Sequence, residues 1–186
     1  MLEIEAKIKV DALEGIRRTL QSLGAQKLET VKQINIFFDR LDHSLRKADE
    51  GLRVRLETSP EHPESKCTLT HKGPKQDTPL HPRVSYDLIT APAEDAVPFI
   101  EALGFVRVLT YGKRRESWFY ESCRVELDEL PHLGTFVEIE GPSEEIVNVV
   151  RTKLDLDRQE LCQDSYVAMM ARYVDEHNVP NRTVMF

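Results

Sequence analysis

The sequence predicts an α+β protein in which eight antiparallel β-strands close into a barrel, a tunnel with a polar lumen flanked by helices. Nearly every strand-like segment alternates apolar and charged residues, as residues 2–10 (LEIEAKIKV) do, and this period of two is typical of a strand with two unlike faces. A closed barrel with its apolar faces outward would gather the charged faces in one lumen. An ordinary β-sandwich with its charged faces in water is the alternative. It does not explain why Arg, Lys, Glu and Asp recur on the polar face of so many strands.

Five strands and two helices are expected in the first half of the chain. The strands cover residues 2–10, 33–39, 52–56, 66–72 and 83–90. The helices cover residues 13–23 and 94–103, where apolar residues recur at helical spacing and a glycine follows, Gly24 or Gly104. Asp11 is the expected N-cap of the first helix. The proline-rich stretches 59–65 and 73–82 are expected to be loops.

The second half is expected to supply three more strands and two helices. The strands cover residues 106–118, 123–128 and 136–140, and the helices cover residues 143–154 and 164–177. Ser143 is the expected N-cap of the earlier helix. Tyr166 is expected to pack on the body of the protein. We therefore expect one tunnel domain over residues 1–177 and a poorly held tail over residues 178–186.

Composition limits the classes of function. The chain has 186 residues, 40% of them hydrophobic and 31% charged, and no apolar run approaches the length of a membrane span. The net charge of −7 disfavours a general nucleic-acid binder. Three widely separated cysteines indicate free thiols, and the six histidines show no zinc-type spacing. We therefore expect a cytoplasmic protein that binds a small molecule rather than a membrane or a nucleic acid.

The charged faces suggest which small molecule. The basic candidates are Lys7, Lys9, Arg53, Arg55, Lys72, Arg83, Lys113 and Arg115. The acidic candidates are Glu3, Glu5, Asp39, Asp87, Glu126, Asp128, Glu138 and Glu140. Arginine forks and lysines suit phosphate oxygens, and clustered carboxylates without His or Cys suit Mg²⁺ or Mn²⁺. Together they predict a site for a metal-bound polyphosphate.

The order of these motifs along the chain carries a resemblance. They are Glu3-x-Glu5-x-Lys7, Arg53-x-Arg55, Lys72, Lys113-x-Arg115, Glu126-x-Asp128 and Glu138-x-Glu140. This set resembles the CYTH superfamily, the triphosphate tunnel metalloenzymes, and the resemblance extends from Glu3 to about Tyr166. It implies an eight-stranded antiparallel tunnel, in agreement with the strand count.

The resemblance also implies roles for these residues. The metal would be held by Glu3, Glu5, Asp128, Glu138 and Glu140. The triphosphate would be held by Lys7, Arg53, Arg55, Lys72, Arg83, Lys113 and Arg115, of which Lys7 and Arg115 would also be catalytic. Gln33 and Asp39 match a family pattern of structural or substrate-shaping residues. The strand at residues 83–90 departs from the family pattern, because Ser85 stands where many members have an acid.

The implied activity has more than one form. The chain looks closest to a class IV adenylyl cyclase, which converts ATP to cyclic AMP and pyrophosphate with two Mg²⁺ or Mn²⁺ ions, and a homodimer is the assembly the family suggests. A triphosphatase that hydrolyses tripolyphosphate, thiamine triphosphate or a nucleoside triphosphate is the alternative. A non-catalytic polyphosphate or nucleotide sensor would keep the cations and lose the acids. Because Glu3, Glu5, Glu138 and Glu140 are all present, catalysis is favoured.

Overall fold

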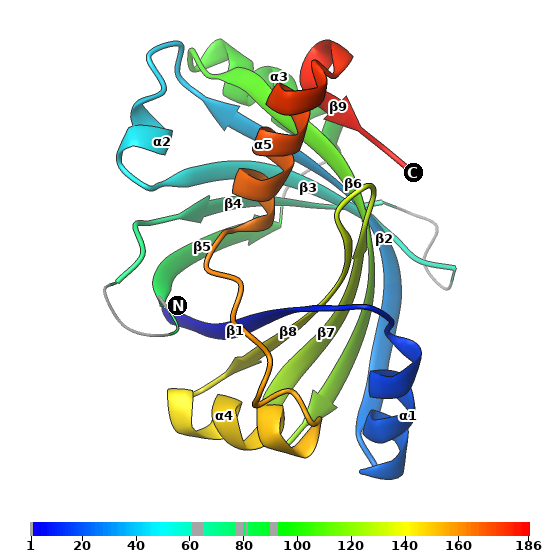
Figure 1. Ribbon diagram of the computed structural model, residues 1–186. Coiled ribbons are helices and arrows are strands. Elements are labelled where there is room, and N and C mark those ends of the chain that lie inside the picture. The colour runs from blue at the N-terminus through cyan, green and yellow to red at the C-terminus, as the bar shows by residue number, and fades with distance from the viewer. Residues whose placement is uncertain (1, 61–64, 77–79, 81, 90–92) are drawn as a thin grey trace.

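The protein is a strongly curled antiparallel sheet with helices on its outside and at its ends (Figure 1). The computed structural model describes residues 2–60, 65–76, 80, 82–89 and 93–186, with backbone alone for residues 2, 3, 93 and 94. The strands are β1 (Leu2–Val10), β2 (Gln26–Asp39), β3 (Gly51–Thr58), β4 (Lys66–Lys72), β5 (Arg83–Ile89), β6 (Val106–Tyr120), β7 (Cys123–Leu130), β8 (Gly134–Gly141) and β9 (Thr183–Val184). The helices are α1 (Glu14–Ser22), α2 (Ser44–Lys47), α3 (Ala93–Ala102), α4 (Glu144–Lys153), α5 (Tyr166–His177) and the short 3₁₀ turn η1 (Pro180–Arg182).

The eight antiparallel strands expected from the sequence are confirmed, and they form a barrel that is open on one side. The pairing order is β2-β3-β4-β5-β1-β8-β7-β6, and β6 returns to pair with β2. At the β1–β5 seam, however, the described residues form only the pairs Leu2–Val84 and Glu3–Arg83. Residues 4–10 of β1 pair with β8 instead, and beyond its first two residues β1 diverges from β5 (Figure 1). The expectation of a fully closed barrel is therefore wrong at this seam.

Most strand boundaries agree with the alternation in the sequence, and β2 is the exception. It begins at Gln26 rather than Gln33, because it forms a long ladder with β6. Its first five residues are exposed, so no burial pattern marks them in the sequence. At α1 the N-cap is Leu13 rather than Asp11, whereas Gly24 adopts the expected positive φ of 72°. Thr90, expected in β5, lies outside the described residues.

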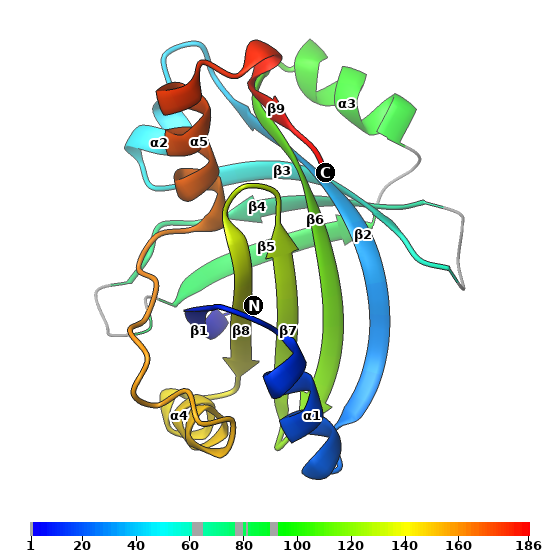
Figure 2. The ribbon, with the colours of Figure 1, turned by 45° about the vertical axis from the view of Figure 1, so that its right-hand side comes forward.

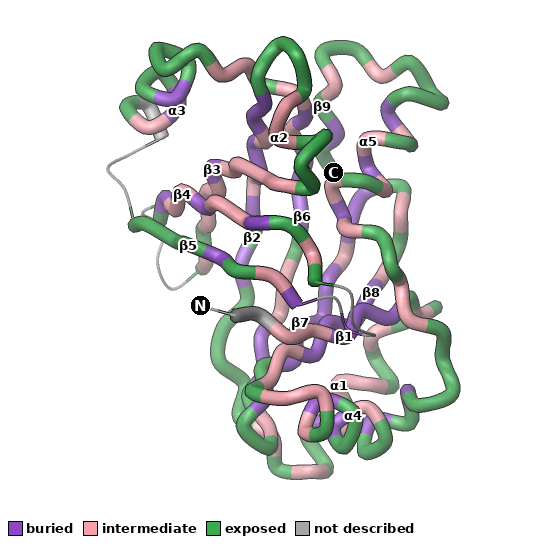
Figure 3. The backbone as a smooth tube through the Cα atoms, turned by 90° about the vertical axis from the view of Figure 1, so that its left-hand side faces the viewer, coloured by how far each residue is buried: buried purple, intermediate pink, exposed green. Residues whose placement is uncertain are grey.

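Helices cover much of the outer face of the sheet. α1 and α4 pack on the outside of β1, β7 and β8, and α3 packs on β2, β3 and β4. α5 and α2 stand at the opposite end of the barrel from α1 and α4 (Figures 1 and 2). Burial is concentrated in β2, β6, β7 and β8, whereas β5 is mostly exposed (Figure 3). Tyr86 and Leu88 on the outer face of β5 are 65% and 64% exposed, so helix cover ends before this strand.

The C-terminal residues are better held than the sequence suggested. β9 pairs in parallel with β6, and Val184 is buried. The Arg114 guanidinium lies 4.0 Å from the centre of the Phe186 ring. The expectation of a poorly held tail over residues 178–186 is therefore wrong. Among the described residues, no helix is both long and apolar enough to cross a membrane.

Candidate active site

The inner faces of the strands enclose one large hollow, with an empty volume of about 3720 Å³ including the solvent at its mouths. α5 lines one end of it through side chains such as Val167 and Ala171. The predicted site residues that line this hollow are Glu5, Lys7, Arg53, Arg55, Lys72, Arg83, Lys113, Arg115, Glu138 and Glu140. Asp128 is fully buried in the wall, and the side chain of Glu3 lies outside the described residues. The charged faces of the strands thus converge on a single hollow, as predicted.

Arg115 on β6 is the centre of a buried cluster of carboxylates. Its guanidinium donates to Asp128 at 2.7 and 2.5 Å and also to Glu138, and it lies 3.7 Å from Glu126. Burial alone would lower the pKa of Arg115, but these three acids raise it well above its usual value. In this state Arg115 neutralises the acids of β7 and β8 and is largely occupied by them.

Lys113 lies two residues earlier on the same face of β6. It is 2% exposed, and its ammonium donates to Asp128 at 3.1 Å. Burial and the nearby positive charge of Arg115 lower the pKa of Lys113 to about 7, and Asp128 only partly opposes them. An added anion in the hollow would therefore favour the charged form of this lysine.

Lys7 joins β1 to the acids of β8. Its ammonium lies 3.3 Å from Glu138 and 3.5 Å from Glu5. Burial would lower the pKa of Lys7, but the two carboxylates outweigh burial and raise it. Burial would likewise raise the pKa of Glu138, yet Lys7 and Arg115 hold it well below its usual value. Glu138 is therefore an ionised carboxylate held between two cations.

The opposite wall, formed by β3, is different because its arginines are poorly compensated. Arg53 donates to the Thr70 hydroxyl at 3.0 Å, and its Nε has no hydrogen-bond partner among the described residues. Burial, followed by repulsion from Arg55, lowers the pKa of Arg53 to about 9. Arg55 is also held with a lowered pKa by burial, and its partners are the amide oxygen of Asn35 and, at 3.9 Å, Glu57. Two half-buried guanidiniums with so few carboxylates around them are suited to binding an anion.

The structure adds residues in or beside the wall of the hollow that charge patterns did not single out. Gln33 donates to Glu57 at 2.6 Å, and Asn35 accepts from Arg55 at 3.0 Å. Within the described part of the chain, the other amide atoms, Gln33 Oε1 and Asn35 Nδ2, are buried without a hydrogen bond. Tyr111 stacks on Phe37 with 5.7 Å between ring centres, and both line the hollow. The only sequence signal for Asn35, Phe37 and Tyr111 is their place on the polar face of β2 or β6.

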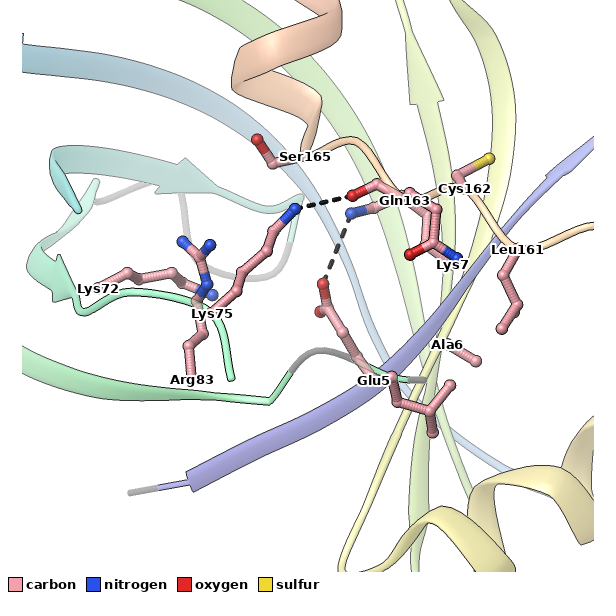
Figure 4. Close-up of a pocket in the computed structure, with 11 residues that line it drawn as sticks. Glu5, Ala6, Lys7, Lys72, Lys75, Arg83, Leu161, Cys162, Gln163 and Ser165 are labelled. Carbon is pink, nitrogen blue, oxygen red and sulfur yellow. Dashed lines mark hydrogen bonds and ion pairs between the residues drawn. The ribbon is translucent and has the colours of Figure 1, made fainter. Parts of the chain in front are cut away.

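A smaller pocket lies at the open β1–β5 seam (Figure 4). Lys72, Lys75 and Arg83 point into it from the β4–β5 side, across from Glu5 and Lys7. The ammonium of Lys75 donates to the carbonyl oxygen of Gln163 at 2.8 Å. Positive charge therefore continues from the hollow into the seam.

Two predicted residues have structural contacts that the sequence did not reveal. Asp39 accepts hydrogen bonds from the backbone N–H groups of Arg40, Leu45 and Arg46, and so it holds the start of α2. Ser85, which stands in place of an acid, is buried and lies directly opposite Lys72 across β4 and β5. The β5 strand therefore supplies no carboxylate at this position.

A divalent cation is compatible with one part of the site. The register places Glu5 directly opposite Glu140, and carboxylates in this position repel each other unless a cation lies between them. No group of three or more His, Cys, Asp or Glu side chains is placed to hold a metal within the described ranges. Mg²⁺ is commonly held by one or two protein carboxylates together with substrate phosphates, so Glu5 and Glu140 are sufficient in number for such a site. Asp128 fits a ligand role less well, because Lys113 and Arg115 already occupy it.

Comparison with known proteins agrees with this geometry. A protein of Methanocaldococcus jannaschii, named as a candidate adenylate cyclase, is 26% identical over 179 residues, which is 91% of this chain and 98% of the relative. The PH1819 protein of Pyrococcus horikoshii has a similar structure, with a TM-score of 0.78, 26% identity and coverage of 92% of this chain and 99% of that one. The Hippeastrum protein HpAC1, described as a candidate adenylyl cyclase with dominant triphosphatase activity, shares the fold at 18% identity, a TM-score of 0.66 and coverage of 96% and 97%. A profile of the CYTH domain matches residues 1–166, and the chain therefore belongs to the CYTH family.

Proposed function

We propose that this protein is a metal-dependent enzyme that binds a triphosphate in its hollow and converts ATP to cyclic AMP and pyrophosphate. The single observation that carries the substrate class is the half-buried pair Arg53 and Arg55, whose charges are poorly compensated by the protein. A polyphosphate supplies the missing negative charge and accepts hydrogen bonds from both guanidinium forks.

The cations that would hold the triphosphate come from several strands around the hollow. Arg53 and Arg55 on β3, Lys72 on β4 and Arg83 on β5 line the wall on which the triphosphate would lie. Lys7 and Lys113 face it from β1 and β6. Arg115 also lines the hollow, but its guanidinium is bonded to Asp128 and Glu138, so its part in charge stabilisation is the least direct.

Glu5 and Glu140 are the residues we propose as metal ligands, with Glu138 beside them. The side chain of Glu5 is 34% exposed and Glu140 lines the hollow, so a hydrated cation can reach both. Mg²⁺ or Mn²⁺ bound there would supply Lewis-acid stabilisation of charge on the phosphates. The chain's own residues hold the triphosphate extended between the two walls and favour an in-line arrangement of the attacking and leaving oxygens.

The reaction is decided by which nucleophile reaches the phosphate chain. The name of the M. jannaschii relative supports cyclisation, and the stacked Phe37 and Tyr111 offer an aromatic surface beside the arginines for a nucleoside. Hydrolysis is the second candidate, because the open seam admits water to the hollow and HpAC1 is described with triphosphatase activity.

Purified protein incubated with Mg²⁺ or Mn²⁺ separates these functions. ATP, tripolyphosphate and thiamine triphosphate are offered in parallel, and products are resolved by chromatography. Cyclic AMP with equimolar pyrophosphate supports the cyclase. Orthophosphate without cyclic AMP identifies a triphosphatase instead, and binding without turnover identifies a sensor. Absence of both binding and turnover would refute the proposal.

A further inference from the structure

Tyr166 lies at the meeting point of two site lysines that come from different parts of the sheet. The ammonium of Lys7 on β1 is 4.5 Å from the centre of the Tyr166 ring, and that of Lys113 on β6 is 5.2 Å from it. Between β1 and β6 stand β8 and β7, so no hydrogen-bonded ladder sets the spacing of these two lysines directly. An aromatic face at these distances attracts an ammonium group through its quadrupole.

Backbone contacts of the segment before α5 hold Tyr166 in this position. The backbone N–H of Cys162 donates to the carbonyl oxygen of Lys7 at 2.8 Å, and Leu161 bridges to Ile8. Ser165 then caps α5 by accepting from the N–H of Ala168, which makes Tyr166 the first residue of the helix. Figure 4 shows Cys162, Gln163 and Ser165 running past Lys7 toward this helix. The segment before α5 is therefore tied to β1 at the lysine that Tyr166 contacts.

Packing accounts for one part of the Tyr166 side chain. It is 7% exposed and meets Phe136 in an edge-to-face contact with 5.1 Å between ring centres. The Tyr166 hydroxyl is buried toward Asp128 and makes no hydrogen bond within normal limits. Packing alone does not require a face shared by two buried ammonium groups.

We propose that Tyr166 is a positioning residue whose ring holds Lys7 and Lys113 toward the bound phosphate chain without neutralising them. This inference rests on the proposed triphosphate site. Glu138 already pairs with Lys7 and Asp128 with Lys113, and a further carboxylate in the place of the ring would cancel more of their charge and repel the substrate. A ring attracts an ammonium while leaving its charge available to phosphate oxygens. The two lysines thereby keep a common orientation that β1 and β6 alone do not impose.

Two substitutions at Tyr166 separate the ring from the hydroxyl. Tyr166→Phe keeps the ring and removes only the hydroxyl, which lies toward Asp128 and has no hydrogen bond of normal geometry among the described residues. Tyr166→Leu removes the aromatic face. Tyr173→Leu is the matched control, because Tyr173 is on the same helix and stacks between His132 and His177, away from the lysines.

Two measurements test the proposal. Calorimetry measures the affinity for tripolyphosphate in the presence of a chelator. Tyr166→Leu should lower this affinity about tenfold, whereas Tyr166→Phe and Tyr173→Leu should change it less than about twofold. Modification of free protein by a lysine-selective reagent, followed by mass spectrometry, should show Lys7 and Lys113 reacting several-fold faster in Tyr166→Leu, with Lys66 unchanged. Melting temperatures confirm that each variant is folded.

Equal weakening by Tyr166→Phe and Tyr166→Leu would overturn the proposal, because it would assign the effect to the hydroxyl. An equal loss of tripolyphosphate affinity in Tyr173→Leu and Tyr166→Leu would also overturn it, because general damage to α5 would then explain the result. If the wild-type protein bound no tripolyphosphate, the proposed function would fail. The modification rates of Lys7 and Lys113 in the free protein would then be the remaining test of the role of the Tyr166 ring. Unchanged rates at Lys7 and Lys113 in Tyr166→Leu would then refute it.

Discussion

Replacing Arg53 with methionine should move stability and substrate affinity in opposite directions. Arg53 is a buried cation on β3 whose Nε is unpaired in the described structure and whose pKa is lowered from 12.5 to about 9 by burial and then by Arg55. Keeping this side chain charged therefore destabilises the folded protein. Methionine fills a similar space without the charge, at the loss of the hydrogen bond to Thr70.

The size of each effect follows from this contact pattern. A pKa lowered by more than three units corresponds, at about 1.36 kcal/mol per unit, to a destabilisation of a few kcal/mol in the folded state. Lost packing and the Thr70 hydrogen bond reduce the gain, so we expect Arg53→Met to stabilise by about 1–2 kcal/mol, or roughly 2–8 °C in Tm for a chain of this length. A charged hydrogen bond to phosphate contributes about 1.5–3 kcal/mol, which predicts a loss of about 10- to 100-fold in tripolyphosphate affinity.

Thermal denaturation and calorimetry measure the two effects on the same preparations. Arg18→Met is the control, because the Arg18 side chain is 72% exposed and lies on α1, outside the hollow. It should change neither quantity. An Arg53→Met protein with lower Tm and unchanged affinity would show that Arg53 is structural, and the case for an anion site on β3 would fail.

Three further predictions concern other parts of the molecule. At pH 8, tripolyphosphate binding should take up protons, because Lys113 has a pKa of about 7 in the free protein and bound phosphate raises it; affinity should therefore fall as pH rises above 7. Calorimetry in buffers of different ionisation enthalpy measures this uptake, and Lys113→Arg should abolish it. Glu140→Gln should lower Mg²⁺-dependent turnover at least tenfold, while the affinity for tripolyphosphate in the presence of a chelator stays the same or improves. Equal losses of turnover and of affinity would contradict a metal-binding role. Deleting residues 183–186 should lower stability by about 1.5–3 kcal/mol, since buried Val184 is lost, and an unchanged melting temperature would count against this packing.

The inward and outward faces of the strands could be predicted because a strand has a strict period of two. The bounds of β4 were predicted as residues 66–72, as observed, and Thr68, Thr70 and Lys72 line the hollow as expected. The start of β2 could not be predicted in this way. Residues 26–30 are exposed and are held by their ladder to β6, which is a contact between distant parts of the chain.

The pairing of charges could not be predicted, because alternation does not reveal which residues on different strands share a level. In the sequence, Lys113-x-Arg115 and Arg53-x-Arg55 look equivalent. The register sets Arg115 opposite Asp128 and within reach of Glu138, whereas Arg53 stands opposite Thr70. Asp39 is a further case, since its partners belong to the start of α2, which the sequence presents as a polar turn.

The asymmetry of the two walls has a consequence for how a substrate lies. Four lining acids, Glu5, Glu126, Glu138 and Glu140, are on β1, β7 and β8, whereas the poorly compensated Arg53 and Arg55 are on β3. We therefore expect a bare triphosphate to be drawn to β3 and a divalent cation to be drawn to Glu5 and Glu140. A metal bound to the triphosphate satisfies both walls at once, because it brings positive charge to the acids and leaves phosphate oxygens for the arginines. We therefore expect the hollow to bind the proposed metal–triphosphate complex better than either component, so that metal and triphosphate bind with positive cooperativity.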